Sequence, residues 1–598
     1  WPQGEGDLRM QNPYWIAYRN LRLNNKKRYM ASAGLSYQIL DWLNVAGRVR
    51  IDNTHSEYEG KLYASSSNTL TDGSTQGHYT VNNGQYSQTY ADVLVNINKR
   101  IQDFTIVANI GASYSGVTSK ELGYAGPIRE TGIPNLFNVY DLDNAKKRAT
   151  QVGWREATES VFASAEVGWK SMLYLTVTGR NDWASQLTHS PQASFFYPSV
   201  GLSVVITEML KLPDWVDYLK VRGSFSSVGN PYPRFLTYPT YSYDANKQDW
   251  KSQTNYPIGK LYPERTDSWE IGLDATLFKD FKLSGSFYYA NTYNQTFDPR
   301  LPVSSGYDKL YVQTGYVRNY GFEAMLSYGH RWGDFSWDSS FTFSANKNEI
   351  VELVKDYVHP ETGKTYNVDK LELKTDEGRG FGKAKFILKE GGTLGDLYTH
   401  ADLKRDINGN ILIDDSGNVT AIDNAGDIKL GSVLPKANLA WNNSFSYKGI
   451  NAGFLLTARL GGIVYSATQA YLDLYGVSET SAAARDAGGV WVNGRSRVNP
   501  QSFYEVVASQ SGLPTYYTYS ATNLRLQEAH IGYTIPRRWL GNVCDINVSL
   551  VGRNLWMIYC KAPFDPEAVA TTNNYYQGID YFMMPSTRNI GFNIKINF

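Results

Sequence analysis

The chain has 598 residues, of which 19% are charged, and its 58 Lys and Arg residues nearly balance its 57 Asp and Glu residues. This balance argues against a nucleic-acid-binding protein, which usually carries a basic surplus on one face. The sequence has no apolar run of about 18 residues, so it predicts no transmembrane helix. Strands of a membrane barrel have lipid-facing residues only at alternate positions and leave a much weaker hydropathy signal.

Several segments with a period of two predict half-buried β-strands. In chain order they are residues 104–114, 268–277, 281–289, 453–460 and 589–598. In the last segment Ile590, Phe592 and Ile594 alternate with Gly591 and Asn593. One face of each strand is therefore expected to be apolar and the other polar.

The connections between these strands differ in length on the two sides. Short polar turns are predicted near Asp41, Arg100–Asp103, Lys170–Ser171, Thr207–Asp217, Lys279–Asp280, Arg331–Asp334, Lys448–Gly449 and Pro536–Asn542. Long stretches rich in Gly, Asn, Ser, Tyr and Asp separate them, such as Asn53–Tyr90, Asn348–Lys436 and Gly461–Ala521. Short turns on one side and long loops on the other are typical of an outer-membrane barrel, whereas a soluble sandwich or propeller has short connections at both ends.

The predicted fold is all-β: a transmembrane, antiparallel, up-and-down β-barrel with short periplasmic turns and long extracellular loops. Pairing the strands across the short turns gives about 17 strands, and barrels of plugged transporters have about 22. Single-chain bacterial barrels usually have an even strand number and periplasmic termini. We therefore expect residues 1–598 to form one barrel domain whose first strands lie upstream.

Short motifs in a fixed order extend along nearly the whole chain. They are Asn12–Trp15, Thr178–Trp183, Phe195–Ser199, Leu219–Ser224, Tyr262–Thr266, Ser268–Gly272, Asn319–Glu323, Asn523–Leu526, Ile531–Pro536, Gly552–Leu555 and Asp565–Glu567. Together they resemble the SusC/RagA family of TonB-dependent outer-membrane transporters of Bacteroidota. No plug domain and no TonB box are found in the sequence, so transport by this chain alone is not expected.

The resemblance implies energised import of oligosaccharides or, in some members, peptides. It implies coupling to the TonB–ExbB–ExbD motor through the missing N-terminal part, and a SusD-like lipoprotein over the extracellular face. It also implies that two such transporter–lipoprotein pairs can form a dimer. The alternative that stays open is a surface-exposed, β-rich carbohydrate-binding or adhesin protein without transport activity.

Charged residues in these strands fall on the polar phase. They are Arg180, Asp182, Lys220, Arg222, Glu270 and Glu323. We expect them to face the lumen and to hold the plug, because Lys or Arg at the lipid midplane costs about 2–4 kcal/mol.

Clustered aromatic residues between the strands are candidates for substrate contact, since aromatic faces pack on the apolar faces of sugar rings. They are Tyr241, Tyr243, Trp250, Tyr471, Tyr475, Tyr516, Tyr517, Tyr575 and Tyr576. The same residues could instead pack the loops together, contact a lid protein or lie at the membrane rim.

The sequence predicts neither an enzyme nor a cofactor. It contains no G-x-S-x-G elbow, no Walker loop and no H-E-x-x-H pair. Asp406–Asn410 imitates the start of an EF-hand loop, but Ile411 and Gly417 stand where the required Gly and Glu belong, which favours a plain turn. Cys544 and Cys560 form either one disulfide or two free thiols.

Overall fold

The computed structural model describes residues 12–237, 242–244, 249–251, 255–256, 261–297, 309–358, 363, 365–373, 383–571 and 577–597. Within these ranges, 17 strands pair in one antiparallel sheet, each beside the next strand of the series. They are β1 (Asn20–Leu40), β2 (Leu43–Tyr63), β3 (Gly77–Ile101), β4 (Phe104–Pro127), β5 (Arg148–Trp169), β6 (Leu173–Ala184), β7 (Phe195–Val205), β8 (Val216–Asn230), β12 (Glu264–Leu277), β13 (Phe281–Phe297), β15 (Val312–Trp332), β16 (Phe335–Glu352), β25 (Ala437–Tyr447), β26 (Ile450–Leu460), β31 (Asn523–Ile535), β32 (Asp545–Cys560) and β34 (Asn589–Asn597). The all-β class and the strand number predicted for this chain are confirmed.

Short and long connections alternate along this series. The short ones are residues 41–42, 102–103, 170–172, 206–215, 278–280, 333–334, 448–449 and 536–544, and they confirm the predicted turns. The connections at the opposite strand ends are residues 64–76, 128–147, 185–194, 231–263, 298–311, 353–436, 461–522 and 561–588, and all of them except 185–194, which has the same length as 206–215, are longer than the short ones. At the turn between β25 and β26, Lys448 and Gly449 have positive φ angles of 47° and 89°, as a tight hairpin turn that matches strand twist requires.

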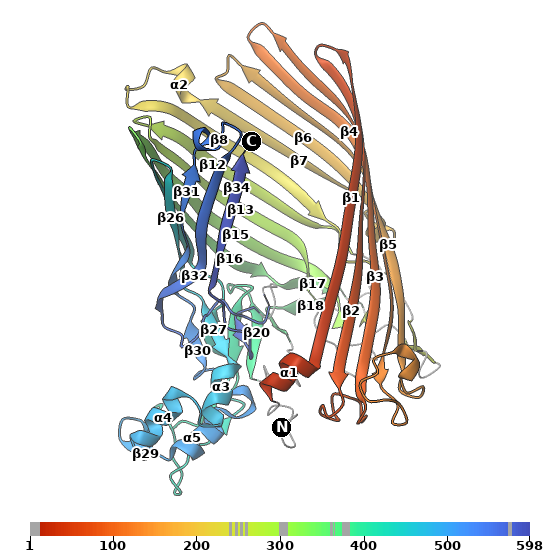
Figure 1. Cartoon of the computed structure of the whole chain (residues 1–598), viewed down its shortest axis with the longest axis vertical. Helices are drawn as coiled ribbons and strands as arrows, with labels where there is room; N and C mark the ends of the chain where they lie inside the picture. The colour runs from red at the N-terminus through yellow and green to blue at the C-terminus, as the bar shows by residue number, and fades with distance from the viewer. Residues whose placement is uncertain are drawn as a thin grey trace. The chain divides into compact units, whose positions relative to one another are not determined.

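The chain divides into two compact units. Unit 1 contains Trp1–Trp169, Thr176–Ser199 and Gly229–Pro263, and unit 2 contains Lys170–Leu175, Val200–Val228 and Glu264–Phe598. In unit 1, β1 to β5 lie side by side and have 21 to 25 residues each (Figure 1). A strand crosses a bilayer with about 9–11 residues, so these strands are about twice the length that a membrane requires.

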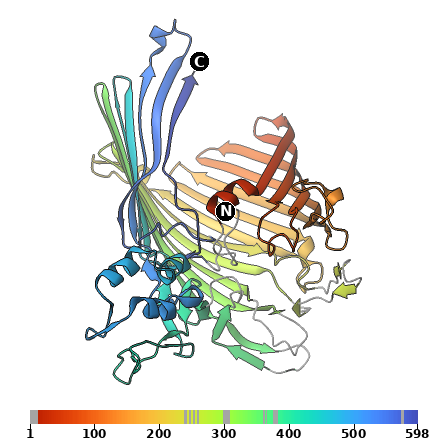
Figure 2. The same ribbon diagram turned by 60° about the horizontal axis from the view of Figure 1, so that its bottom comes forward.

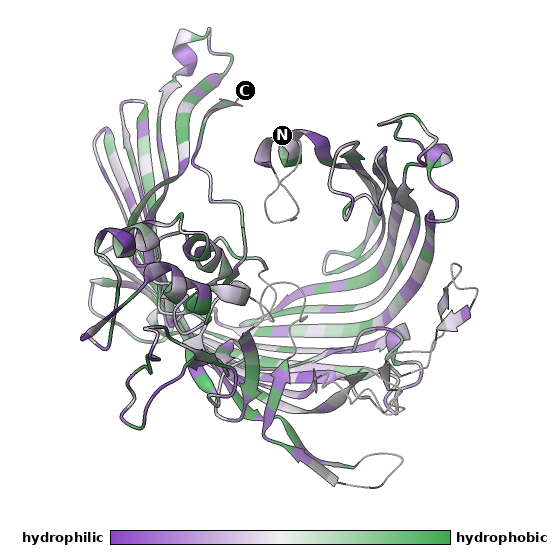
Figure 3. Ribbon diagram, turned by 90° about the horizontal axis from the view of Figure 1, so that it is seen from below, coloured by the Kyte–Doolittle hydropathy of each residue, from purple (hydrophilic) through white to green (hydrophobic). Residues whose placement is uncertain are grey.

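The two faces of the sheet have opposite character. In unit 1 one row across five strands is Leu35, Gly47, Val93, Ala112 and Val161, and the adjacent row is Gly34, Arg48, Asp92, Ser113 and Ser160. Because successive side chains of a strand point to opposite faces, the first row lies on an apolar face and the second on a polar face. Hydrophobic and hydrophilic residues alternate along the strands in the same way in Figure 3.

The apolar face of unit 2 is also uncovered by other described residues. Ile271 pairs with Phe287, which pairs with Phe322, and Ile271 is 59% exposed. At the other end of the series Leu550 pairs with Phe592, which is 79% exposed. Apolar side chains exposed in a continuous wall mark a surface that meets something other than water.

The prediction that Asn53–Tyr90 forms one long loop is wrong. β2 continues to Tyr63 and β3 begins at Gly77, so the two strands stay paired along most of that stretch. Here both faces carry polar residues, and the period of two disappears from the sequence while the backbone ladder continues. Hydropathy marks where a strand has an apolar face, and it does not mark where the strand ends.

Further elements lie before β1 and in the connections, mostly the long ones. They are α1 (Pro13–Arg19), α2 (Ile206–Met209), α3 (Ala467–Leu474), α4 (Glu479–Asp486) and α5 (Pro500–Val507), the single-turn helices η2 (Val139–Asp141), η3 (Ser185–Leu187), η5 (Ser509–Ser511) and η6 (Arg537–Trp539), and the strands β9 (Ser242–Asp244), β10 (Asp249–Lys251), β11 (Asn255–Tyr256), β14 (Lys309–Leu310), β17 (Val354–Val358), β18 (Thr365–Val368), β19 (Lys370–Leu373), β20 (Ala384–Lys389), β21 (Asp396–Thr399), β22 (Asp402–Leu403), β23 (Ala421–Ile422), β24 (Ile428–Ser432), β27 (Ile463–Ser466), β28 (Val490–Val492), β29 (Ser496–Val498), β30 (Thr518–Ser520) and β33 (Ile579–Asp580). No described helix is long and apolar enough to cross a membrane.

The connections of unit 2 share a hydrophobic core. Phe386, Leu397, Tyr465, Val507 and Ile579 belong to it, although they come from three different connections. Helices α3 to α5 gather beside this core (Figure 2). Each begins after a capping side chain, Ser466, Ser478 or Asn499, that accepts a hydrogen bond from a backbone amide of the first turn. These connections therefore form a packed structure, which we call the loop core.

Phe386→Ala should destabilise the loop core, because Phe386 is fully buried and its removal leaves a cavity. The expected loss of folding stability is about 3–5 kcal/mol. It should appear as faster proteolysis within residues 353–436. Ile407→Ala is the matched control, since Ile407 is fully exposed in the same connection. Equal proteolysis rates for the two variants would contradict the proposed packing.

Candidate functional site

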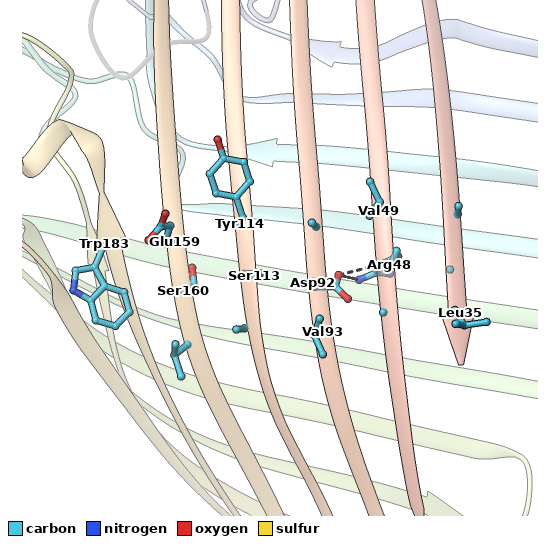
Figure 4. Close-up of a pocket in the computed structure, with 16 residues that line it drawn as sticks. Leu35, Arg48, Val49, Asp92, Val93, Ser113, Tyr114, Glu159, Ser160 and Trp183 are labelled. Atoms are coloured by element: carbon cyan, nitrogen blue, oxygen red, sulfur yellow. Dashed lines mark hydrogen bonds and ion pairs between the residues drawn. The ribbon is translucent and has the colours of Figure 1, made fainter. Parts of the chain in front are cut away.

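The polar face of unit 1 carries arginines paired with carboxylates on neighbouring strands. Arg48 of β2 donates to Asp92 of β3, with 2.7 Å between Nη2 and Oδ2 (Figure 4). Arg28 of β1 pairs with Asp52 of β2 at 2.5 Å. Each pair joins adjacent strands, so the charges on this face are largely compensated within the sheet.

Two of the predicted polar-phase residues, Arg180 and Asp182, form one cluster in unit 1. Arg180 Nε donates to Asp182 Oδ1 at 2.7 Å, and its Nη2 donates to Ser160 Oγ at 2.8 Å. The hydroxyl of Tyr197 donates to the other oxygen of Asp182. The cluster ties β5, β6 and β7 together on the polar face, because the guanidinium donates one hydrogen bond to a carboxylate and another to a serine hydroxyl.

The predicted residues of unit 2 lie on the polar face of β8, β12 and β15. Arg222 reaches Asp274 at 2.6 Å and Glu270 at 3.4 Å, and Asp274 also accepts a hydrogen bond from Ser284 at 2.7 Å. Lys220 lies two residues before Arg222 on β8, so the two side chains are on the same face of the sheet. Glu323 pairs in register with Ser286 of β13 and Ser344 of β16.

A buried ion-pair network joins β31 to the connection 561–588. The sequence analysis did not predict this contact. Arg525 Nη2 lies 2.8 Å from Asp565 Oδ1 and 3.1 Å from Glu567 Oε2, and the Arg525 side chain is 8% exposed. Burial opposes the charged form of Asp565, but the Arg525 hydrogen bonds and the backbone amide of Glu567 outweigh it and lower the pKa of this carboxyl. The motifs Asn523–Leu526 and Asp565–Glu567 already contain these partners.

The predicted aromatic residues occupy different environments. Tyr243 and Trp250 are exposed and in contact, with their ring centroids 5.2 Å apart, and Tyr475 is also exposed. The ring centroid of Tyr471 lies 5.3 Å from that of Phe582, and the ring centroid of Tyr516 lies 6.3 Å from that of Phe503. Tyr241, Tyr575 and Tyr576 lie outside the described residues.

Tyr517 packs inside the loop core instead of presenting its ring to a ligand. It is 2% exposed, and its hydroxyl donates to Asp473 Oδ2 at 2.9 Å. Burial and the negative charge of Asp473 raise the pKa of Tyr517. Its role in the structure is therefore to satisfy a buried carboxylate of α3.

The described residues contain no cluster of His, Cys, Asp and Glu suited to a metal ion. Asp406 accepts hydrogen bonds from the backbone amides of Asn408 and Asn410 at 2.8 Å each, which is the geometry of an Asp-capped turn. Cys544 and Cys560 are both free thiols.

The apolar face of unit 1 has a shallow hollow of about 760 Å³. Leu35, Val49, Val93, Tyr114 and Trp183 are among the side chains that line it (Figure 4). Small residues of the same strands, such as Ala33 and Ala91, form its floor. The hollow lies in the wall of exposed apolar side chains and contains no catalytic group.

The sequence profile of the TonB dependent receptor-like, beta-barrel family matches residues 3–555. The chain belongs to this family. Its strand order, its alternating faces and its unequal connections are those of the family's barrel.

Curated relatives share the same family. TonB-dependent receptor P3 of Formosa agariphila is 23% identical over 98% of this chain and 60% of its own length. TonB-dependent receptor SusC of Bacteroides thetaiotaomicron is 24% identical over 66% of this chain and 40% of its own length. The chain thus spans about half the length of the curated relatives that it matches.

Solved structures of this family have the same fold. The RagAB peptide transporter superposes on 98% of this chain and 64% of its own chain, with a TM-score of 0.74 and 17% identity. The 'open-open' state of the RagAB peptide importer gives a TM-score of 0.71 at the same identity. These likenesses establish the fold of this TonB-dependent receptor barrel.

Arg525→Gln should release the connection 561–588 from β31. Removing one partner of a buried ion pair costs about 3–5 kcal/mol, because the other charges stay buried without compensation. The expected result is rapid proteolytic cleavage within residues 561–588 in detergent. Arg553→Gln is the control. The Arg553 side chain is 66% exposed in its 3.0 Å pair with Glu528, so this substitution should lower the folding stability by at most about 1 kcal/mol. Similar cleavage of both variants would show that Arg525 does not hold the segment.

Proposed function

We propose that this chain is the outer-membrane barrel of a SusC-type, TonB-dependent importer. The observation that carries the proposal is the sheet with one uncovered apolar face and one polar, ion-paired face. The strands from β2 to β32 satisfy their backbone groups through neighbours on both sides, which is the condition for placing strands in hydrocarbon, and β1 and β34 are each paired in register on one side. The unequal connections supply short turns for one side of the membrane and long loops for the other.

Import of this type also depends on partner proteins. We propose coupling to the TonB–ExbB–ExbD motor and a SusD-like lipoprotein over the loops, with two transporter–lipoprotein pairs forming a dimer. Support comes from the names of the relatives, which are TonB-dependent receptors and include SusC. The packed loop core offers a firm platform for a protein partner on the side of the long connections.

The cargo that we propose is an oligosaccharide or a peptide. The exposed aromatic pair Tyr243–Trp250 supports the first, because aromatic faces suit sugar rings. The resemblance in fold to the RagAB peptide importer is compatible with the second. We also propose that Arg180, Asp182, Lys220, Arg222, Glu270 and Glu323 face the lumen, on the side where a plug domain would lie. A surface adhesin or lectin remains the competing function, and it would need no lipid-facing wall.

Ile110→Lys should impair insertion of the barrel, whereas Asn109→Lys should not. The two residues are neighbours on β4, but Ile110 is 53% exposed on the apolar face and Asn109 hydrogen-bonds Ser164 on the polar face. Lysine near the bilayer midplane costs about 2–4 kcal/mol, which a urea titration of the chain in lipid vesicles would measure.

Two results would contradict the proposal. Equal stability of the two lysine variants would mean that the apolar face does not meet lipid. Recovery of the expressed chain in the aqueous fraction without detergent would favour the adhesin or lectin instead.

A further inference from the structure

A hollow of about 770 Å³ lies on the polar face of unit 2, across β13, β15, β16, β25, β26 and β31. One transverse row of side chains crosses it, and each member pairs in register with the next. The row is Ser286, Glu323, Ser344, Asn438, Arg459 and Asn523. Because all of these side chains lie on one face, they form a line of polar groups that crosses the strands at right angles.

The hollow is open because most members of the next row are small. Ser284, Thr342, Ala440 and Thr457 line the hollow together with Met325, which lies between Ser284 and Thr342 in that row. Glu323 and Arg459 both belong to the first row and lie on the same side of this floor. Three strand spacings separate them, which is about 14 Å at about 4.8 Å per spacing.

Arg459 differs from the other arginines that are near the hollow. Its Nη2 donates to the carbonyl of Val433 at 2.7 Å, and its Nε is buried without a hydrogen-bond partner. The carboxylate of Glu567, which also lines the hollow, acts on Arg459 electrostatically, but among the described residues the two form no ion pair within 4.0 Å. Arg222 and Arg525, in contrast, are each paired with two carboxylates. A partly buried guanidinium without an anion is costly and calls for an anionic partner.

Glu323 is the opposite case at the other end of the row. It is exposed, and its partners in register, Ser286 and Ser344, offer hydroxyls but no positive charge. Among the described residues it forms no ion pair within 4.0 Å. The row therefore presents one anion and one cation, neither of them in an ion pair among the described residues, about 14 Å apart.

We propose that this hollow is a binding site for a short zwitterionic ligand, with its carboxylate on Arg459 and its ammonium on Glu323. An extended chain spans about 3.3–3.6 Å per residue, so a peptide of about four residues fits the distance. Asn438 and Ser344 lie between the two charges and can hydrogen-bond the ligand backbone. The inference deepens the proposed importer function by assigning the ligand chemistry of the polar face.

The charge pattern separates this ligand from the other cargo classes. A neutral oligosaccharide would leave both charges uncompensated. An acidic oligosaccharide would satisfy Arg459 and be repelled by Glu323. Only a ligand with both charges satisfies both ends of the row.

The test is isothermal titration calorimetry of the full 598-residue chain in detergent. The probes are tetra-alanine with free ends, its C-terminal amide, its N-acetyl form and trigalacturonate. We expect tetra-alanine to bind, and each blocked form to bind at least about tenfold more weakly, since one charge-assisted contact is lost. Trigalacturonate should bind more weakly than tetra-alanine.

Variants assign each loss to a residue. Arg459→Gln should weaken tetra-alanine about tenfold or more and should no longer distinguish the acid from the amide. Glu323→Gln should in the same way no longer distinguish the free amine from the N-acetyl form. Arg553→Gln, an ion-paired polar-face arginine that does not line the hollow, is the matched control and should bind tetra-alanine as the unchanged chain does.

Three results would overturn the proposal: no binding of tetra-alanine, equal binding of its acid and amide, or tightest binding of trigalacturonate. Circular dichroism and heat-modifiable migration on gels verify that each variant is folded, and Arg459→Lys keeps the charge if Arg459→Gln does not fold. Failure here would leave the membrane insertion of the barrel untouched, because the lysine variants of β4 test that separately.

Discussion

The structure depends on one constraint: each strand must pair its backbone with neighbours on both sides while its side chains alternate between two unlike surroundings. The ladder meets the first condition from β2 to β32, with β1 and β34 each paired in register on one side, and rows such as Leu35–Val161 and Gly34–Ser160 meet the second. A slip of register by one residue would exchange the two faces. Register is therefore fixed by the contrast between an apolar and a polar surface, with tight turns such as Lys448–Gly449 fixing it locally.

Charge on the polar face follows from the same arrangement. Arginines that cannot face lipid project to the polar face, where strands about 4.8 Å apart place carboxylates within reach. Arg48 and Arg222 each find a partner in this way, and Arg180 pairs with Asp182 two residues along its own strand. Arg525 uses the same chemistry to fasten the connection 561–588 to the sheet. Arg459 and Glu323 form no such pair, and this difference is the basis of the binding site that we propose for the polar face.

Much of the fold follows from local sequence. The period of two in residues 281–289 and the polar turns near Lys279 and Lys448 are short-range signals, and they placed strands and hairpins correctly. The end of β2 and the beginning of β3, within Asn53–Tyr90, were not predicted as strands because both faces of the sheet are polar there. The helices α3 to α5 were missed because long-range packing in the loop core, and not a strong local pattern, stabilises them.

The site was less accessible to prediction. Sequence placed Arg222, Glu270 and Glu323 on the polar phase, but the pairing of Arg222 with Asp274 requires the register of two strands that are distant in sequence. The row from Ser286 to Asn523 requires the register of five successive strand pairs. Tyr517, predicted as a candidate for substrate contact, is buried in the loop core, where its hydroxyl donates to Asp473, a contact between residues far apart in the chain.

The most direct test of the two-faced sheet is a cysteine scan of β13 in lipid vesicles. Residues 282 to 288 would be replaced one at a time in a variant that lacks Cys544 and Cys560, and labelled with a charged, water-soluble maleimide. The account predicts labelling at positions 282, 284, 286 and 288, and protection at 283, 285 and 287 until detergent is added. Uniform labelling along the strand, or protection with the opposite phase, would contradict it.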